Sequence, residues 1–354
     1  MLPIPLHHRK INCEMKDNYK AWEIDFNGFE NAKMQKEKLR FLIGFAVLAP
    51  SGHNSQPWRF EIHENSIMLC PDWDRALAKS DPTNRQMYIS LRCALENLLI
   101  AADYYGFKTK VIYTPQENIA ASVFFENTAD REARENHLIF SIPKRRTNRN
   151  KYEQKLPPPN FYEAVRPLTT ENVKVDFIED SQKRQQLAAI AMDSLLMAMD
   201  DDTFREELSH YIKSNITDSK IGMPGFGFGM PTPISFVAHR LIKKYNMNRL
   251  SKKQDEGVLK NFTPAFGVIS GKQDDKKSWI IAGQTYERIA LEAVRIGMQT
   301  APLAAAIQWG DFSQQLQQIL NTNFRPHVFF RIGYPVKEAK PNPRLPALEV
   351  ISIQ

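Results

Sequence analysis

The chain has 354 residues, of which 42% are hydrophobic and 25% are charged, so it can bury a large core as one large domain or two. Lysine and arginine exceed aspartate and glutamate by 47 to 40, which gives a net charge of +7. This modest excess suits an anionic small molecule rather than nucleic acid, which usually requires a dense basic patch. No apolar run reaches the length of a membrane span, so a membrane is not expected as a partner either.

The three cysteines, Cys13, Cys70 and Cys93, are isolated in the sequence. An odd number of separated thiols is typical of a reducing compartment and argues against a cysteine-based metal site. The first residues also lack the apolar core of a signal peptide. We therefore expect a cytoplasmic protein with free, buried thiols and no metal centre.

Residues 1–35 predict an N-terminal arm that packs on the body, and we assign no chemistry to it. A helix follows, because apolar residues recur at three- and four-residue steps on one face. These residues are Leu39, Phe41, Leu42, Phe45, Ala46 and Leu48. Pro50 is expected to end this helix.

The helix leads into a polar loop, Pro50–Trp58, with the sequence PSGHNSQPW. Apolar segments on both sides fix the loop, so it presents backbone N–H and side-chain amide groups outward. Asn54 and Gln56 each offer a donor and an acceptor side by side, which suits a flat heterocycle with polar edges. The alternative is a helix C-cap and an ordinary turn, because Gly, Ser and Asn are typical turn residues.

The next segment mixes strands and a helix, as an α+β fold does. Its expected elements are strands Trp58–His63, Ser66–Cys70, Lys110–Tyr113 and Ala121–Phe125, and a helix Asn84–Tyr105. The first two strands are expected to form a hairpin.

A second polar stretch, Lys144–Arg149, places four cations and two short hydrogen-bonding side chains within six residues. Guanidinium groups match phosphate oxygens bidentately, and the Thr147 hydroxyl can add a further donor. The alternative is a solvated surface or a connector, which is what most basic runs are.

Taken together, the two stretches resemble motifs of the flavin (FMN)-dependent nitroreductase superfamily. The run Pro50–Trp58 looks like its P-S-x-x-N-x-Q-P-W loop, and Arg145–Arg149 looks like its R-x-[ST]-x-[KR] phosphate element. Ordinary members carry the phosphate element first and are homodimers, with flavin at the subunit interface. Here the order is reversed, which is the arrangement of the single-chain, Acg-type branch that this sequence resembles over most of its length.

The resemblance implies an α+β, nitroreductase-like fold with two degenerate halves that form an intramolecular pseudo-dimer. A weak internal repeat agrees with this, because Glu287 and Gly297 match Glu96 and Gly106 at a constant offset. We expect an arm at 1–35, a first half at 36–141 and a second half at 142–354. Each motif occurs once, so one flavin site per chain is expected, in a monomer or a weak homodimer.

The second half contains a glycine- and proline-rich insertion that carries exposed-type Phe and Met residues. Either it is an irregular segment pinned on the core, or it covers something. The related branch has a comparable segment folded across the flavin, so we expect a lid at 214–250.

The resemblance also implies the contacts of the cofactor. The residues expected to bind FMN are Pro50, Ser51, Gly52, His53, Asn54, Gln56, Arg145, Arg146, Thr147, Arg149, Ala304, Ala305 and Arg344. The arginines and Thr147 would hold the phosphate, the loop would contact the isoalloxazine or ribityl, and a backbone N–H at Ala304 or Ala305 would approach flavin N5. No side chain is expected to be catalytic, because flavins carry their own chemistry.

The activity implied is a ping-pong reduction of nitroaromatics, quinones or similar small acceptors, with NAD(P)H as reductant and hydride transfer through flavin N5. The alternative is an FMN-binding or storage protein with an occluded site and little reductase activity. His53 is the only candidate proton donor in the loop, and a hydrogen-bonding role is the simpler interpretation for it.

Overall fold

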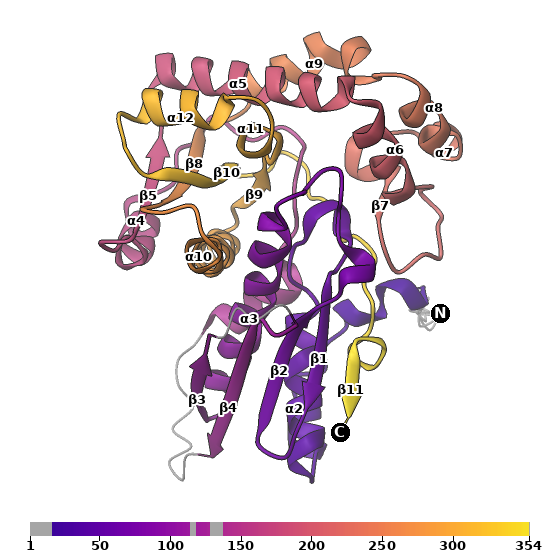
Figure 1. The fold of residues 1–354 in the computed structure, drawn as a ribbon, viewed down its shortest axis with the longest axis vertical. Coiled ribbons are helices and arrows are strands. Elements are labelled where there is room, and N and C mark those ends of the chain that lie inside the picture. The colour runs from indigo at the N-terminus through magenta and orange to yellow at the C-terminus, as the bar shows by residue number, and fades with distance from the viewer. Residues whose placement is uncertain (1–15, 114–117, 128–136, 354) are drawn as a thin grey trace, which may run out of the picture.

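The computed structural model of the chain describes residues 16–113, 118–127 and 137–353. The two larger of the three described sheets lie at opposite ends of the molecule, and two long helices, α3 (Arg85–Tyr104) and α10 (Lys276–Arg295), lie between them (Figure 1). Along the chain, strands and helices alternate irregularly, and most strand pairs are antiparallel. The predicted α+β class is confirmed.

The first sheet has the strand order β11-β1-β2-β4-β3. Its strands are β1 (Trp58–Ile62), β2 (Ser66–Pro71), β3 (Phe107–Ile112), β4 (Ala121–Asn127) and β11 (Ile351–Ile353). The predicted hairpin is present as β1 and β2, with Phe60 opposite Leu69. The last strand, β11, pairs with β1 in parallel, so the end of the chain completes the sheet that the first half begins.

The second sheet has the order β5-β8-β10-β9. Its strands are β5 (Val173–Ile178), β8 (Ala265–Gly271), β9 (Gln299–Pro302) and β10 (Arg325–Gly333). Every residue of β8 is buried, because helices cover both faces of the sheet. Phe266 and Phe329 face one apolar cluster, while Ile269 and Phe330 face the other, which is the alternation of a pleated strand.

The longer helices supply the layers around these sheets. They are α2 (Gln35–Ala46), α3 (Arg85–Tyr104), α5 (Ser181–Asp200), α6 (Asp202–Tyr211), α9 (Asn248–Asn261), α10 (Lys276–Arg295) and α12 (Phe312–Leu320). Helices α5 and α12 cover the outer face of the second sheet, and α10 covers the inner face (Figure 1).

Short elements fill the remaining chain. They are α1 (Gly28–Asn31), α4 (Pro159–Val165), α7 (Thr232–Ser235), α8 (Ala238–Lys244), α11 (Ala305–Gln308), β6 (Ile212–Lys213), β7 (Met223–Pro224), and the 3₁₀ helices η1 (Asp17–Trp22), η2 (Gly52–Asn54), η3 (Trp73–Arg75), η4 (His137–Lys144), η5 (Arg166–Leu168), η6 (Gly225–Phe228) and η7 (Ala347–Glu349). Among the described residues, no helix is both long and apolar enough to cross a membrane.

Helices α3 and α10 cross closely at Gly283. A Cβ atom on Gly283 would lie 2.4 Å from the carbonyl oxygen of Ile89 and 2.8 Å from Cβ of Arg92. Cys93 also lies at this crossing, where its thiol donates to the Gly283 carbonyl oxygen over 3.3 Å. The two helices that carry the predicted repeat therefore pack directly on each other. Cys70 and Cys93 are free and buried, while Cys13 lies outside the described residues.

Candidate functional site

The loop that follows α2 has a strained backbone. His53, Asn54 and Gln56 have φ values of 49°, 56° and 54°, which non-glycine residues rarely adopt. The loop is stabilised from within, since the Gln56 N–H donates to Oγ of Ser51 over 3.0 Å. Backbone strain of this kind persists only where surrounding contacts fix it, and it clusters at functional sites.

The amide side chains of Asn54 and Gln56 bind protein backbone. Nδ2 of Asn54 donates to the carbonyl oxygens of Gly222 and Pro343 over 2.9 and 3.0 Å. Nε2 of Gln56 donates to the Lys220 carbonyl over 2.7 Å, and its Oε1 accepts from the Leu345 N–H over 2.9 Å. These amides therefore tie the loop to two distant segments, and their contact with a heterocycle stays a prediction.

Two of the predicted phosphate-binding arginines bind the residues that join α2 to this loop. Arg145 and Arg344 are 2% and 3% exposed. Nη2 of Arg145 donates to the Leu48 carbonyl over 3.0 Å, and Nη2 of Arg344 donates to the Ala49 carbonyl over 3.1 Å. Arg344 Nη1 also donates to Oδ1 of Asn54. Residues almost 300 positions apart thus converge on the end of α2.

Arg145, Arg146 and Arg344, which we call the arginine cluster, lie near one buried carboxylate, which pairs with Arg145 and attracts Arg344. Oε1 of Glu287, on α10, lies 3.4 Å from Nε of Arg145. Burial raises the pKa of Glu287 to about 7, although Arg145 opposes this shift. Burial lowers the pKa of Arg344 well below its usual value, and the charges of Arg145 and Arg146 lower it further. The cluster therefore carries an excess of positive charge.

Several donors of the arginine cluster are unused. Among the described residues, Nη1 and Nε of Arg145 and Nε of Arg344 are buried and have no hydrogen-bond acceptor. A buried donor without an acceptor is costly, and more so on a charged group. Unused donors around an excess of positive charge are what an anion with several oxygens would satisfy.

The second part of the phosphate element reaches across to the second sheet. Thr147 forms a bridge with Thr300 of β9, and the Asn148 N–H donates to the Thr300 carbonyl over 3.0 Å. Arg149, which retains exposed surface, extends to the glycine-rich insertion. Its Nη2 lies 4.0 Å from the Met223 sulfur, and its guanidinium lies 4.9 Å from the centre of the Phe228 ring.

The remaining predicted residues border the same region. Ala304 is the N-cap of α11, and Ala305 packs on an apolar cluster that also holds Met223 and Phe204. The His53 ring lies 5.9 Å from the ring of Phe204 and 5.8 Å from that of Tyr211. Pro50 and Gly52 are half-buried in the loop itself.

Sequence reasoning missed Trp22. The Arg146 and Arg344 guanidiniums lie 4.1 and 4.9 Å from the centre of its ring, so the N-terminal arm contributes to the arginine cluster. No pattern in the sequence indicates this contact, because a single tryptophan in an irregular arm has no periodicity to read.

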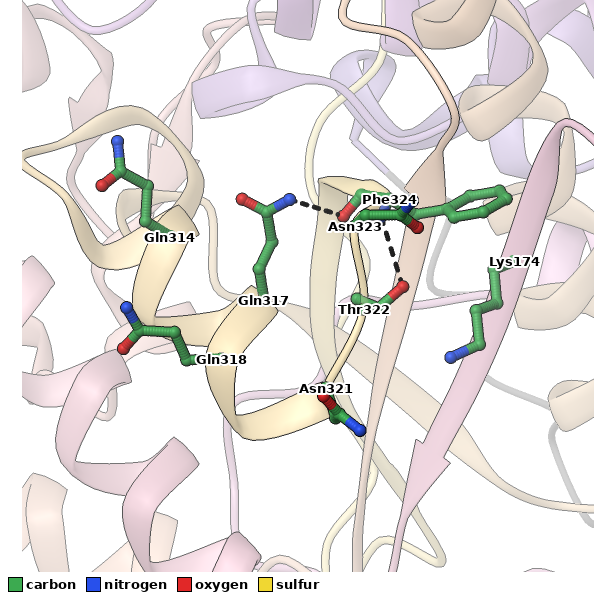
Figure 2. A pocket seen from close by; sticks show the side chains of 8 residues that line it. All are labelled: Lys174, Gln314, Gln317, Gln318, Asn321, Thr322, Asn323 and Phe324. Atoms are coloured by element: carbon green, nitrogen blue, oxygen red, sulfur yellow. Dashed lines mark hydrogen bonds between the residues drawn. The ribbon is translucent and has the colours of Figure 1, made fainter.

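A separate hollow of about 700 Å³ lies on the surface of the second sheet (Figure 2). Its lining residues are Lys174, Gln314, Gln317, Gln318, Asn321, Thr322, Asn323 and Phe324. Two of its side chains bind backbone, since Gln317 donates to the Phe324 carbonyl and Thr322 accepts from the Phe324 N–H. The hollow is open and contains no predicted site residue, so it is distinct from the arginine cluster.

Comparison with known sequences gives relatives over nearly the full length of the chain, although no family model matches it. Two proteins of Mycobacterium tuberculosis named "Putative NAD(P)H nitroreductase" are each 23% identical to it, over 90% and 87% of this chain and 91% and 92% of their own length. A third protein from the same organism, named only as uncharacterized, is 24% identical over 89% of this chain and 93% of its own.

Comparison with solved structures gives partial overlaps. The NADPH:FMN oxidoreductase of Vibrio harveyi, complexed with NAD⁺, covers 61% of this chain and 76% of its own, with a TM-score of 0.38 and 13% identity. Nitroreductase A of Vibrio parahaemolyticus covers 60% and 72%, with a TM-score of 0.37 and 14% identity. Overlaps this low carry no argument about the site, which rests on the contacts described above.

Proposed function

We propose that this chain, a member of the nitroreductase superfamily, is an FMN-dependent NAD(P)H oxidoreductase that reduces nitroaromatics, quinones or similar small acceptors. The names of its mycobacterial relatives support an oxidoreductase that uses NAD(P)H. One observation carries the FMN assignment: the loop Pro50–Trp58, the element Arg145–Arg149 and Arg344 come together around buried guanidiniums, and several N–H donors of these groups have no hydrogen-bond acceptor among the described residues.

The residues present fit the phosphate of FMN. The unused donors of Arg145 and Arg344 suit phosphate oxygens, which accept charge-assisted hydrogen bonds from guanidinium groups. Arg146, Thr147 and Arg149 follow on the same short segment and complete the phosphate set that we assign.

The loop has a different role in this proposal. We assign Asn54 and Gln56 to holding the loop in shape, because their amides bind backbone carbonyl and N–H groups. Ser51 and His53 are half-buried and remain the loop side chains assigned to the isoalloxazine or ribityl.

FMN, when bound, accepts a hydride from NAD(P)H and passes electrons on to the acceptor. The chain's own residues bind and orient it. Arg145 is held between the Leu48 carbonyl and Glu287, so its position is fixed before any ligand arrives. Preorganisation of this kind lowers the cost of ordering side chains on binding.

A second candidate function, FMN storage, is favoured by the contacts of the insertion. Met223 and Phe228 contact Arg149, and the backbone at Lys220 and Gly222 is bound by Gln56 and Asn54. We propose that residues 214–250 form a lid and that in the storage case it excludes nicotinamide.

The visible absorption spectrum of the purified protein, before and after addition of NADPH without oxygen, distinguishes the two functions. An oxidoreductase shows a flavin spectrum that bleaches. A spectrum that persists supports storage. A colourless protein that also fails to take up added FMN contradicts both.

The variant Arg149→Gln tests the phosphate assignment. Loss of one charge-assisted hydrogen bond costs about 1.5–3 kcal/mol, so we expect FMN affinity to fall about 10- to 100-fold. Flavin fluorescence titration measures the dissociation constant. Arg166→Gln, which removes an exposed arginine in η5 outside the proposed lid, is the matched control. Unchanged affinity in Arg149→Gln would remove this residue from the phosphate set.

A further inference from the structure

The N-terminal arm is fastened to both segments that close around the loop. Nζ of Lys16 lies 2.9 Å from Oδ1 of Asp218, and Nδ2 of Asn18 donates to the carbonyls of Thr217 and Ser219 over 3.0 and 3.1 Å. The Asn18 carbonyl accepts from the Arg344 N–H over 2.9 Å. The arm is therefore part of the wall next to the arginine cluster.

Trp22 ends the 3₁₀ helix of this arm and is held rigidly. Its side chain is nearly buried, with 7% of the residue exposed. The indole Nε1 donates to the Asn342 carbonyl over 2.8 Å, which fixes the plane of the ring. The Arg146 and Arg344 guanidiniums both contact this one ring.

The Trp22 ring offsets the repulsion between the buried guanidiniums without occupying their N–H donors, as a carboxylate would. Burial and then the charge of Arg145 lower the pKa of Arg146 to about 10, although Glu338 opposes this shift, so the neighbouring cations repel one another. An aromatic face attracts a cation through its quadrupole and uses none of the N–H groups in the guanidinium plane. A carboxylate would stabilise the same cations but would occupy those donors, and so would compete with an anionic ligand.

We infer that Trp22 is a positioning residue that holds Arg146 and Arg344 for the phosphate and thereby makes the site prefer FMN to riboflavin. This inference rests on the proposed FMN function and adds the selection between the phosphorylated and the unphosphorylated flavin. Trp22 acts through the arginines.

Paired titrations with FMN and riboflavin test this role in the apoprotein. We expect Trp22→Leu to lose about tenfold in FMN affinity, in proportion to the cation–π contacts removed, and to change riboflavin affinity less than twofold. Trp22→Phe, which restores an aromatic face, is expected to recover most of the loss. Trp73→Leu removes an exposed tryptophan outside the cluster and serves as the control.

An equal loss for both flavins would show a purely structural role for Trp22 and would overturn the inference, as would unchanged FMN affinity. A wild type that binds neither flavin contradicts the proposed function instead. In that case the shift in thermal unfolding midpoint that inorganic phosphate causes in each apoprotein decides the role of Trp22. A shift that wild type, Trp22→Phe and Trp73→Leu share and that Trp22→Leu lacks supports the role, and the same shift, or none, in all four proteins overturns it.

Discussion

His53 has an environment unlike that of its neighbours in the polar loop. Its ring packs on Phe204 and Tyr211, and its buried Nε2 has no hydrogen-bond partner among the described residues. The pKa of His53 is lowered to about 4, chiefly by burial, with Glu207 opposing the shift and Arg149 adding to it. The imidazole is therefore neutral near pH 7, which leaves no charged proton donor in the loop.

This environment predicts how stability depends on pH. The unfolded chain binds a proton at His53 below about pH 6.5, whereas the folded chain does so only near pH 4. Between these values the unfolded state holds more protons, so the free energy of unfolding falls as the pH falls, by up to about 1.4 kcal/mol per pH unit for one proton. The contribution of neutral His53 to the free energy of unfolding is complete above about pH 6.5.

Replacement His53→Asn, which tolerates positive φ, is expected to reduce this acid-side slope. Urea unfolding of the apoprotein at intervals from pH 4 to 7 measures it. His327 has a similarly lowered pKa and remains in both proteins, so only the difference between the curves reports His53. Parallel curves would mean that His53 titrates normally in the folded state.

Residue identities predicted part of the site. Charge and spacing indicated Arg145, Arg146 and Arg149, whereas only the family resemblance indicated Arg344. Arg145 and Arg344 bind the carbonyls that follow α2, and Arg149 contacts the glycine-rich insertion. The amides of Asn54 and Gln56 could not be assigned in this way, because an amide satisfies a backbone carbonyl as well as a heterocycle. Their partners at 220–222 and 343–345 are set by the tertiary fold.

At the scale of elements, the close crossing of α3 and α10 depends on Gly283. A methyl group there would meet the backbone of Ile89, which cannot move without shifting α3. We expect Gly283→Ala to destabilise the protein by about 1–3 kcal/mol, as overpacked cores do.

Thermal unfolding of Gly283→Ala against Gly44→Ala measures this effect. Gly44 lies within α2 and has no neighbouring atom within 4 Å of an added Cβ, so the alanine there is expected to stabilise by about 0.5–1 kcal/mol. A fall in the unfolding midpoint for Gly283→Ala together with a rise for Gly44→Ala supports close packing of α3 and α10. A Gly283→Ala variant as stable as wild type contradicts it.

Periodicity and turn residues predicted elements of the first half. The hairpin Trp58–Cys70 and the helix Asn84–Tyr105 were predicted to within a few residues. The pairing of β11 with β1 was not predicted, because a three-residue strand after a proline-rich tail has no pattern that names its partner. Long-range strand order is set by packing, which local sequence does not encode.

At the scale of the whole molecule, the end of the chain crosses back over the site. The tail brings Arg344 to Asn54, places Leu345 against Gln56, and then adds β11 to the first sheet. The division into halves at 36–141 and 142–354, which we propose from the repeat, is therefore incomplete in one respect. The first half lacks a strand that only the second half supplies.

This exchange predicts that the halves do not fold apart. A fragment 1–141 would expose the edge of β1 and the face of α3 that Gly283 now covers, so it would leave apolar surface and backbone groups unpaired. Thermal unfolding followed by circular dichroism, for each fragment alone and for the two mixed, measures whether either half unfolds cooperatively. We expect little cooperative unfolding from either fragment alone and recovery of a cooperative transition on mixing. A fragment 1–141 that melts cooperatively on its own would show that β11 and α10 are dispensable to the first half.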